Sequence, residues 1–185
     1  IFDQPLPPTS TDYYDDTSRM KFDGNVLACI ELSSAQVDSL NLSVEVDGTP
    51  TNAVVLDRTL FYPEGGGQLG DQGTLVNGST VNVLDTRIEG EVILHLTDGP
   101  VEGTVTGHLN ESRRRQLMDH HTAVHIVGGS ARAILGPHIW QAGSNKGERY
   151  ARLDVTHFQR RTRDDLDSIE DHANAIISQN PSIEK

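Results

Sequence analysis

The sequence is poor in cysteine and in long apolar runs, and each shortage excludes a class of protein. Its single cysteine, Cys29, cannot form an internal disulfide, which favours a reducing compartment such as the cytoplasm. No stretch approaches the roughly eighteen continuous apolar residues of a membrane span. Residues 1–5 lack the basic and apolar parts of a signal peptide, and the first residue is not methionine. We therefore expect a cytoplasmic segment of a longer chain, with no membrane partner.

Lysine is also scarce, whereas acidic residues are abundant. Three lysines stand against twelve arginines, and the net charge is −12. An acidic, lysine-poor composition is typical of proteins from a salt-loaded cytoplasm, and it argues against a surface that binds phosphates by charge alone. The arginines are clustered, so they could contact RNA phosphates locally or pair with neighbouring carboxylates. The clusters are 113–115, 149 and 152, and 160, 161 and 163.

Short strands separated by turn residues fill the first half of the chain. Residues 1–24 are rich in Pro, Thr, Asp and Tyr and form an extended lead-in or linker. Over 25–109, alternating apolar residues indicate half-buried strands, as at 92–96, and glycines supply tight turns at 77–78 and 89–90. We therefore expect a small antiparallel β-barrel here. Its predicted strands are 25–32, 42–46, 52–56, 59–62, 73–76, 80–85, 91–96 and 102–108.

A long helix opens the second subdomain, which covers 110–185. Asn110 can cap this helix, its apolar and small residues recur at helical spacing as far as Leu135, and Gly136-Pro137 ends it. The sequence therefore predicts an α+β chain, in which the barrel is followed by an α/β domain whose long helix packs on an antiparallel sheet. The other predicted elements of this domain are strands at 138–142 and 150–155 and a second helix capped by Thr162.

Two histidines on the long helix are the first candidates for a functional site. His121 and His125 are four residues apart, so both imidazoles project from one helix face, as two nitrogen ligands of a tetrahedral zinc ion do. His120 points elsewhere and is not an expected ligand. Thr122 stands where a metalloprotease His-Glu-x-x-His motif has its glutamate, which disfavours an unrelated zinc hydrolase. The remaining histidines have no ligand partner at useful spacing and are predicted to be structural or surface residues: His95, His108, His138, His157 and His172.

A run of three glycines at 65–67, followed by Gln68, is the second candidate. Such a run forms a tight turn or a phosphate loop, and a nucleotide P-loop is disfavoured because no Gly-Lys-Ser/Thr follows. Glycine has no Cβ and lets the backbone approach a ligand closely, while the Gln68 amide can both donate and accept hydrogen bonds. Thr59, just before the run, could place its hydroxyl near a substrate or be an ordinary strand threonine.

Four motifs resemble the editing region of alanyl-tRNA synthetases, which also occurs as free-standing editing proteins. They lie at 57–73, around Phe-Tyr-Pro-Glu-Gly-Gly-Gly-Gln; at 114–125, ending in His-His-Thr-Ala-Val-His; at 140–144, Trp-Gln-Ala-Gly-Ser; and at 152–157, Arg-Leu-Asp-Val-Thr-His. The likeness covers roughly residues 10–180, and the doubled histidine is similar to the archaeal type. The lead-in is similar to the linker after the aminoacylation region, which favours a synthetase segment over a free-standing editor.

The resemblance implies hydrolysis of serine or glycine wrongly esterified to tRNA(Ala), with the acceptor end of the tRNA as partner and no part for DNA. It implies a zinc ion held by His121, His125, and a Cys and a His from a later Cys-x-x-x-His motif, which this sequence does not contain. It implies the catalytic residues Gln68 and Thr59, and the substrate-binding residues Gly65, Gly66, Gly67, Gln141, Gly143 and Ser144.

With half of the zinc ligands, the segment alone is expected to bind zinc weakly and to be inactive. ATP and Mg are expected only in the aminoacylation domain of the parent protein. Two other functions stay open at this point, a free-standing trans-editing deacylase and a non-catalytic tRNA-binding fragment.

Overall fold

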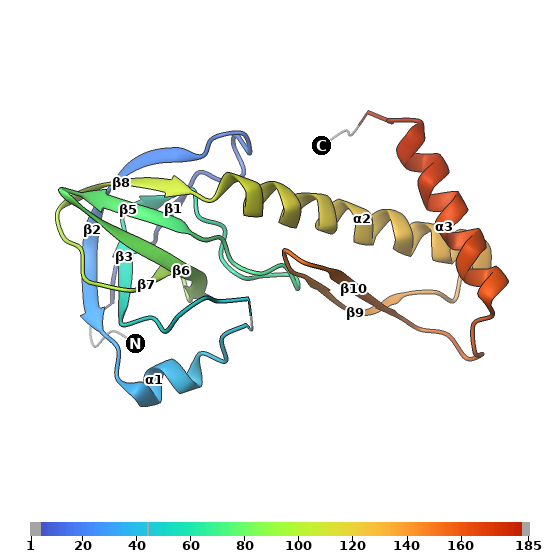
Figure 1. Ribbon diagram of the computed structural model, residues 1–185, viewed down its shortest axis with the longest axis horizontal. Coiled ribbons are helices and arrows are strands. Elements are labelled where there is room, and N and C mark those ends of the chain that lie inside the picture. Colours follow the sequence, from blue (N-terminus) through green and yellow to red (C-terminus); the bar gives the residue numbers. More distant parts are fainter. Residues whose placement is uncertain (1–4, 44, 183–185) are drawn as a thin grey trace. The chain divides into compact units, whose positions relative to one another are not determined.

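A computed structural model describes residues 5–43 and 45–182, and the chain divides into two compact units, 1–115 and 116–185 (Figure 1). The boundary lies inside the long helix α2 (Glu111–Leu135), so this helix begins in one unit and ends in the other. The helix starts and stops as predicted, with Gly136 at a φ of 114° directly after it. No helix among the described residues is long and apolar enough to span a bilayer.

A closed antiparallel barrel forms most of the first unit (Figure 1). Each strand pairs with the next around the ring, and the first strand pairs with the last, so every edge in the barrel is used. Gly78 and Gly90 have positive φ angles of 68° and 62° and turn the chain between neighbouring strands, as predicted. The strand order is β2 (Lys21–Glu31), β3 (Asn52–Leu56), β7 (Val92–Thr97), β6 (Ser79–Glu89), β5 (Gly73–Asn77) and β8 (Thr104–Leu109).

Two apolar clusters stabilise this unit, one inside the barrel and one on its outer side. The inner cluster includes Phe61, Leu75 and Val83, all of them almost fully buried. The outer cluster includes Leu94 and Leu96, and the short helix α1 (Ser34–Ser39) contributes Val37 to it. Strand β7 is therefore buried on both faces, and the alternation at 92–96 reports packing against α1 rather than a strand with one solvated face.

Several elements differ from the sequence prediction. The described residues of 42–46 form no strand; Leu42 packs on the outer cluster from a loop, which explains the apolar pattern. The predicted strand 59–62 shortens to β4 (Arg58–Thr59), which pairs in parallel with β1 (Ser10–Thr11). Helix α1 was not predicted, although Ser33 and Gln36 form a capping box that is visible in the sequence.

The second unit consists of the rest of α2, a two-stranded antiparallel sheet and a second helix, as the predicted α+β class requires (Figure 1). The sheet pairs β9 (Gln141–Lys146) with β10 (Ala151–Val155), so the first of these begins later than predicted. Helix α3 (Arg163–Ser178) follows Thr162, which caps it as predicted, together with Asp165. The apolar cluster between the helices and the sheet of this unit is small, and its buried members are Ala131, Ile139 and Ile169.

Candidate functional site

The glycine run forms a tight turn, which was one of the two structures expected for it. The N–H of Gly65 donates to the carbonyl of Gln68 at 3.0 Å, and the N–H of Gln68 donates back at 2.9 Å. Gly66 and Gly67 between them have φ angles of 57° and 79°. Two successive positive φ angles define a type I′ turn, which glycine adopts without strain. Gln68 itself is only 5 % exposed.

A buried ion pair holds the base of this turn. Asp71 is 1 % exposed and accepts the N–H of Tyr62 at 2.7 Å, which ties the two ends of the glycine loop together. Arg114, in the first turns of α2, binds this carboxylate with both Nε and a terminal nitrogen, and it also donates to the carbonyl of Leu60 at 2.6 Å. A charge pair with this many hydrogen bonds fixes the loop more firmly than a surface pair would.

Arg113 supports the same loop from a second side. Its guanidinium donates to the carbonyl of Gly70 at 3.2 Å and pairs with Glu45 at 3.5 Å. Of the two roles left open for the cluster 113–115, pairing with carboxylates is therefore the confirmed one. Only Arg115 lies at the surface, where it pairs with Glu111 one turn away at 2.8 Å.

Thr59 is fully buried in a hydrogen-bonded network with His95. The Nδ1 of His95 lies 3.0 Å from the carbonyl of Val54, which can only accept, so Nδ1 carries the proton. The Nε2 then accepts from the Thr59 hydroxyl at 2.8 Å, and that hydroxyl accepts the N–H of Phe61 at 3.0 Å. Burial lowers the pKa of His95 to about 4, which keeps this imidazole neutral. His95 is thus a structural residue, as predicted, while a catalytic part for Thr59 stays a prediction.

Sequence reasoning overlooked Glu64, which directly precedes the glycines. Its carboxylate pairs with Arg87 at 2.6 Å, and Arg87 also binds Asp85 at 2.6 Å. Burial raises the pKa of Glu64, and the positive charge of Arg87 partly offsets that rise. A carboxyl group with a raised pKa beside a predicted substrate loop is a candidate for proton transfer, and only the fold shows its burial.

His121 and His125 lie on one face of α2, as the sequence predicts. Their rings stack with centroids 5.1 Å apart and planes 19° apart. Burial, and next the charges of Lys146 and His125, lower the pKa of His121, which favours the neutral imidazole that a metal requires. His120 faces another way, with Nδ1 2.6 Å from the carbonyl of Gly147.

The paired imidazoles match two of the four ligands that a tetrahedral zinc ion requires. Over residues 5–43 and 45–182, no group of three or more His, Cys, Asp or Glu side chains could hold a metal. The two rings therefore fit zinc in ligand type and in placement, while two further ligands would have to come from elsewhere.

The predicted substrate-binding residues of the second unit gather on β9. The Gln141 amide donates to the Ser144 hydroxyl at 3.1 Å, and Lys146 donates to the same hydroxyl at 2.7 Å. A Cβ at Gly143 would lie 2.9 Å from a carboxylate oxygen of Asp154, so a side chain there would require the Asp154 side chain to move. Lys146 was overlooked in the sequence; burial lowers its pKa.

His138 and His157, predicted to be structural or surface residues without a ligand partner at useful spacing, form a hydrogen bond with each other that the sequence did not predict. Thr156 bridges their two segments, with its hydroxyl donating to the carbonyl of His138 at 2.8 Å. The Nε2 of His138 consequently lies 2.9 Å from the Nδ1 of His157, and the exposed ring of Phe158 packs beside both. The two histidines are nineteen positions apart in the sequence, which hid this contact from any argument based on spacing.

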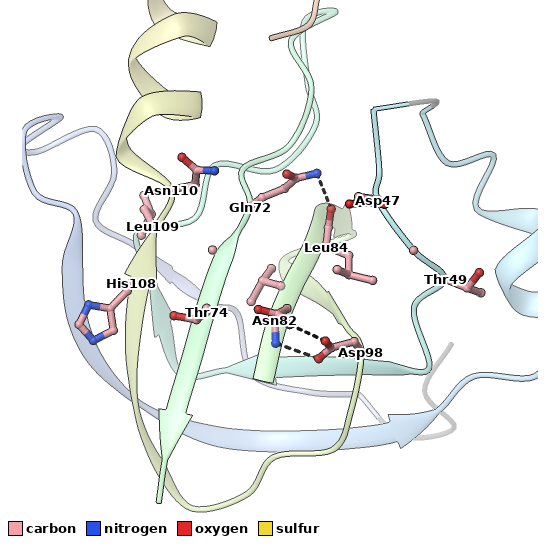
Figure 2. Close-up of a pocket in the computed structure, with 13 residues that line it drawn as sticks. Asp47, Thr49, Gln72, Thr74, Asn82, Leu84, Asp98, His108, Leu109 and Asn110 are labelled. Atoms are coloured by element: carbon pink, nitrogen blue, oxygen red, sulfur yellow. Dashed lines mark hydrogen bonds between the residues drawn. The ribbon is translucent and has the colours of Figure 1, made fainter. Parts of the chain in front are cut away.

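A cavity of about 560 Å³ beside β5, β6 and β8 contains none of the predicted site residues (Figure 2). Its polar groups bind one another, as Asn82 does with Asp98 and Gln72 with the carbonyl of Leu84. Asp47 and Asp98 make its wall acidic, which opposes the approach of a phosphate. This cavity is therefore not a candidate for RNA binding.

Comparison with known proteins adds a family to this geometry. The sequence profile of a family described as tRNA synthetases class II (A) matches residues 7–112. The chain is 43 % identical over 182 residues to an alanine–tRNA ligase of Halobacterium salinarum, 42 % over 181 residues to one of Haloquadratum walsbyi, and 41 % over 177 residues to one of Metallosphaera sedula. These matches cover 97 %, 96 % and 93 % of this chain, but only 18 %, 18 % and 17 % of the relatives.

Proposed function

Because this chain belongs to the class II (A) tRNA synthetases, we propose that it is the part of an alanine–tRNA ligase that hydrolyses serine or glycine wrongly attached to tRNA(Ala). The observation that carries the proposal is the stacked pair His121 and His125 on one helix face. Aminoacylation, with its ATP and Mg, belongs to another part of the whole protein. The substrate is the acceptor end of a tRNA, and the reaction takes place in the cytoplasm.

The chemistry asked of the site is attack by water on an aminoacyl ester. Gly66 and Gly67 expose a turn of bare backbone, which the pair Arg114–Asp71 holds in place. We assign to the Gln68 amide, which is 5 % exposed beside this turn, the task of orienting the ester or the water, and on the second unit the bonded pair Gln141–Ser144 offers further donors and acceptors. Each of these groups acts by positioning the ester or the water, and a rigid loop base favours such positioning.

Zinc, when bound, would order the substrate or polarise water. His121 and His125 would hold it with two ligands from a Cys-x-x-x-His motif elsewhere in the intact protein. The neutral state favoured at His121 suits this task, since a protonated imidazole cannot bind a metal.

The test is made in the intact ligase. We expect His121→Ala and His125→Ala each to lose zinc in metal analysis and to lose deacylation of seryl-tRNA(Ala). His120→Ala is the matched control, because His120 sits on the same helix but bonds to Gly147 instead. Full zinc retention in both histidine variants would refute the metal assignment and favour a non-catalytic tRNA-binding role, which the incomplete ligand set already makes the second candidate.

Gln68→Ala provides a separate test of the glycine turn. Loss of one orienting hydrogen bond should slow single-turnover deacylation by about 1–3 kcal/mol of transition-state stabilisation. Because Gln68 is buried, its truncation should also lower the melting temperature, so deacylation is compared below the melting temperature of the variant, with aminoacylation by the same protein as the control. Unchanged deacylation would remove Gln68 from the mechanism.

A further inference from the structure

A cavity of about 190 Å³ in the second unit is lined by residues with no part in the proposed hydrolysis, apart from His125 and Gln141. We name it the Trp140 groove. Its floor is the side of α2, and its walls come from β10 and from the segment that leads into β9. The lining residues are Val124, His125, Gly128, Gly129, Arg132, Ile139, Trp140, Gln141, Leu153 and Val155.

Trp140 makes the groove unusual, because its indole is 63 % exposed. The Arg132 guanidinium lies over the ring, 4.1 Å from its centroid, and a terminal nitrogen of Arg132 donates to the carbonyl of Ile139 at 3.2 Å. These contacts orient the indole without burying it. An exposed aromatic ring fixed beside an arginine is the platform on which proteins stack unpaired nucleobases.

Gly129 keeps the floor of the groove bare. Glycine inside a helix costs about 1 kcal/mol relative to alanine. A Cβ at Gly129 would meet nothing within 4 Å, whereas a Cβ at its neighbour Gly128 would contact Leu153 at 3.5 Å. Packing therefore does not explain a glycine at position 129, while a ligand that lies against the helix would.

The charge of the groove suits a nucleotide. Arg132 lines it and no acidic residue does, in contrast to the cavity of Figure 2 with Asp47 and Asp98. The whole second unit is also close to neutral, with nine acidic and eight basic residues. A phosphate next to a base in this groove therefore meets little repulsion.

We propose that the Trp140 groove binds an unpaired nucleobase of the tRNA acceptor end by stacking on Trp140. The proposal rests on the proposed function, which supplies the RNA, and it adds the place where a base is held. Gln141 presents an amide to the edge of that base, and His125, one of the two paired imidazoles, also lines the groove. A base held here would fix the end of the RNA strand next to the candidate zinc ligands.

Trp140 is the only tryptophan of the chain, so its emission reports on this groove alone. The probe is an RNA hairpin with a short single-stranded 3′ end, compared with the same hairpin whose last nucleotide is abasic. Both are titrated into the full chain in molar KCl and EDTA, because salt suppresses binding through phosphates and EDTA removes metal. We expect quenching by the intact hairpin and an affinity about tenfold or more lower for the abasic one.

Variants separate stacking from folding. Gly129→Leu should fill the groove and weaken binding about tenfold or more, while Gly129→Ala should raise the melting temperature and weaken binding less. With a labelled hairpin read by anisotropy, Trp140→Phe should bind nearly as well as the parent chain and Trp140→Ala should not.

Three outcomes would overturn the proposal. They are equal affinity for intact and abasic hairpins, unchanged affinity in a folded Gly129→Leu variant, and a Trp140 emission that changes with protein concentration alone as the chain dimerises. The last would make the groove an interface between two copies. None of these readouts needs zinc or deacylation, so a failure here leaves the proposed function standing and is distinguishable from a failure of that function.

Discussion

The two units of the molecule use charge in opposite ways. Residues 1–115 contain 18 acidic and seven basic residues, a net charge of −11, whereas residues 116–185 have a net charge of −1. Yet the acidic unit is the one that buries an ion pair, Arg114 with Asp71, inside its fold. In the near-neutral unit, the pairs Arg152–Asp154 and Arg163–Asp167 lie at the surface.

The two units also differ in the size of their apolar cores. The inner cluster of the barrel contains eleven buried apolar residues, and the cluster of the second unit contains three. The second unit instead leaves large side chains in solvent, among them Trp140 at 63 % and Phe158 at 77 % exposure. The barrel unit therefore buries its large apolar side chains, while the second unit leaves several of its own at the surface, where the proposed ligand would meet them.

The sharpest test of this contrast compares two adjacent arginines on one helix. Arg114→Ala leaves the buried carboxylate of Asp71 without its partner and should lower the free energy of unfolding by about 3–5 kcal/mol. Arg115→Ala breaks only the exposed pair with Glu111 and should cost less than about 1 kcal/mol. Urea unfolding of both variants measures the difference, and similar losses would show that the barrel does not depend on its buried pair.

The pH dependence of the barrel provides the second test. The pKa of His95 is about 4 when folded and 6.5 when unfolded, so the unfolded chain binds the proton more readily between these values. Stability should therefore fall as the pH drops from about 6.5 to about 4, by on the order of 3 kcal/mol from this residue. His95→Gln keeps a donor and an acceptor but does not titrate.

Urea unfolding of the parent chain and of His95→Gln at several pH values isolates that contribution, because other titrating groups act in both proteins. The stability difference between the two should change across the window. A constant difference would mean that His95 stays protonated or solvated in the folded barrel.

The smallest expected effect is a difference in how strongly salt stabilises the two units. Repulsion among the carboxylates of residues 1–115 is relieved when molar KCl shortens the Debye length to about 3 Å. We expect the melting temperature to rise by several degrees, and hydrogen exchange to slow more in the barrel strands than in α3. Equal protection of both units would show that the uneven charge has no energetic consequence.

Patterns close together in the sequence predicted the fold well. The strand and turn signals of 73–109 depend on neighbouring residues, and each became a paired strand of the barrel. Helix α2 was found because one apolar stripe, a cap and a terminal glycine agree. Residues 42–46 failed for a tertiary reason, since Leu42 is apolar to fit the outer cluster and not to pair in a sheet.

The sequence predicted an arrangement of candidate-site residues only where those residues lie close together in the chain. His121 and His125 needed nothing beyond the pitch of a helix. The charged partner of Asp71 lies 43 residues away in the sequence, and the partners of His95 lie 36 and 41 residues away. No local pattern reports such pairs, so the sequence could name the arginine cluster but could not choose between a carboxylate and an RNA phosphate for it.

Helix α2 has a consequence for how such a protein can be recombined in evolution. Its opening residues belong chemically to the barrel, because Arg113 and Arg114 bind groups at positions 45, 60, 70 and 71. A genetic exchange just before the helix would separate Asp71 from the arginine that neutralises its charge. A viable crossover has to fall beyond residue 114, so a gene that inherits the barrel is expected to inherit the start of the histidine-bearing helix with it.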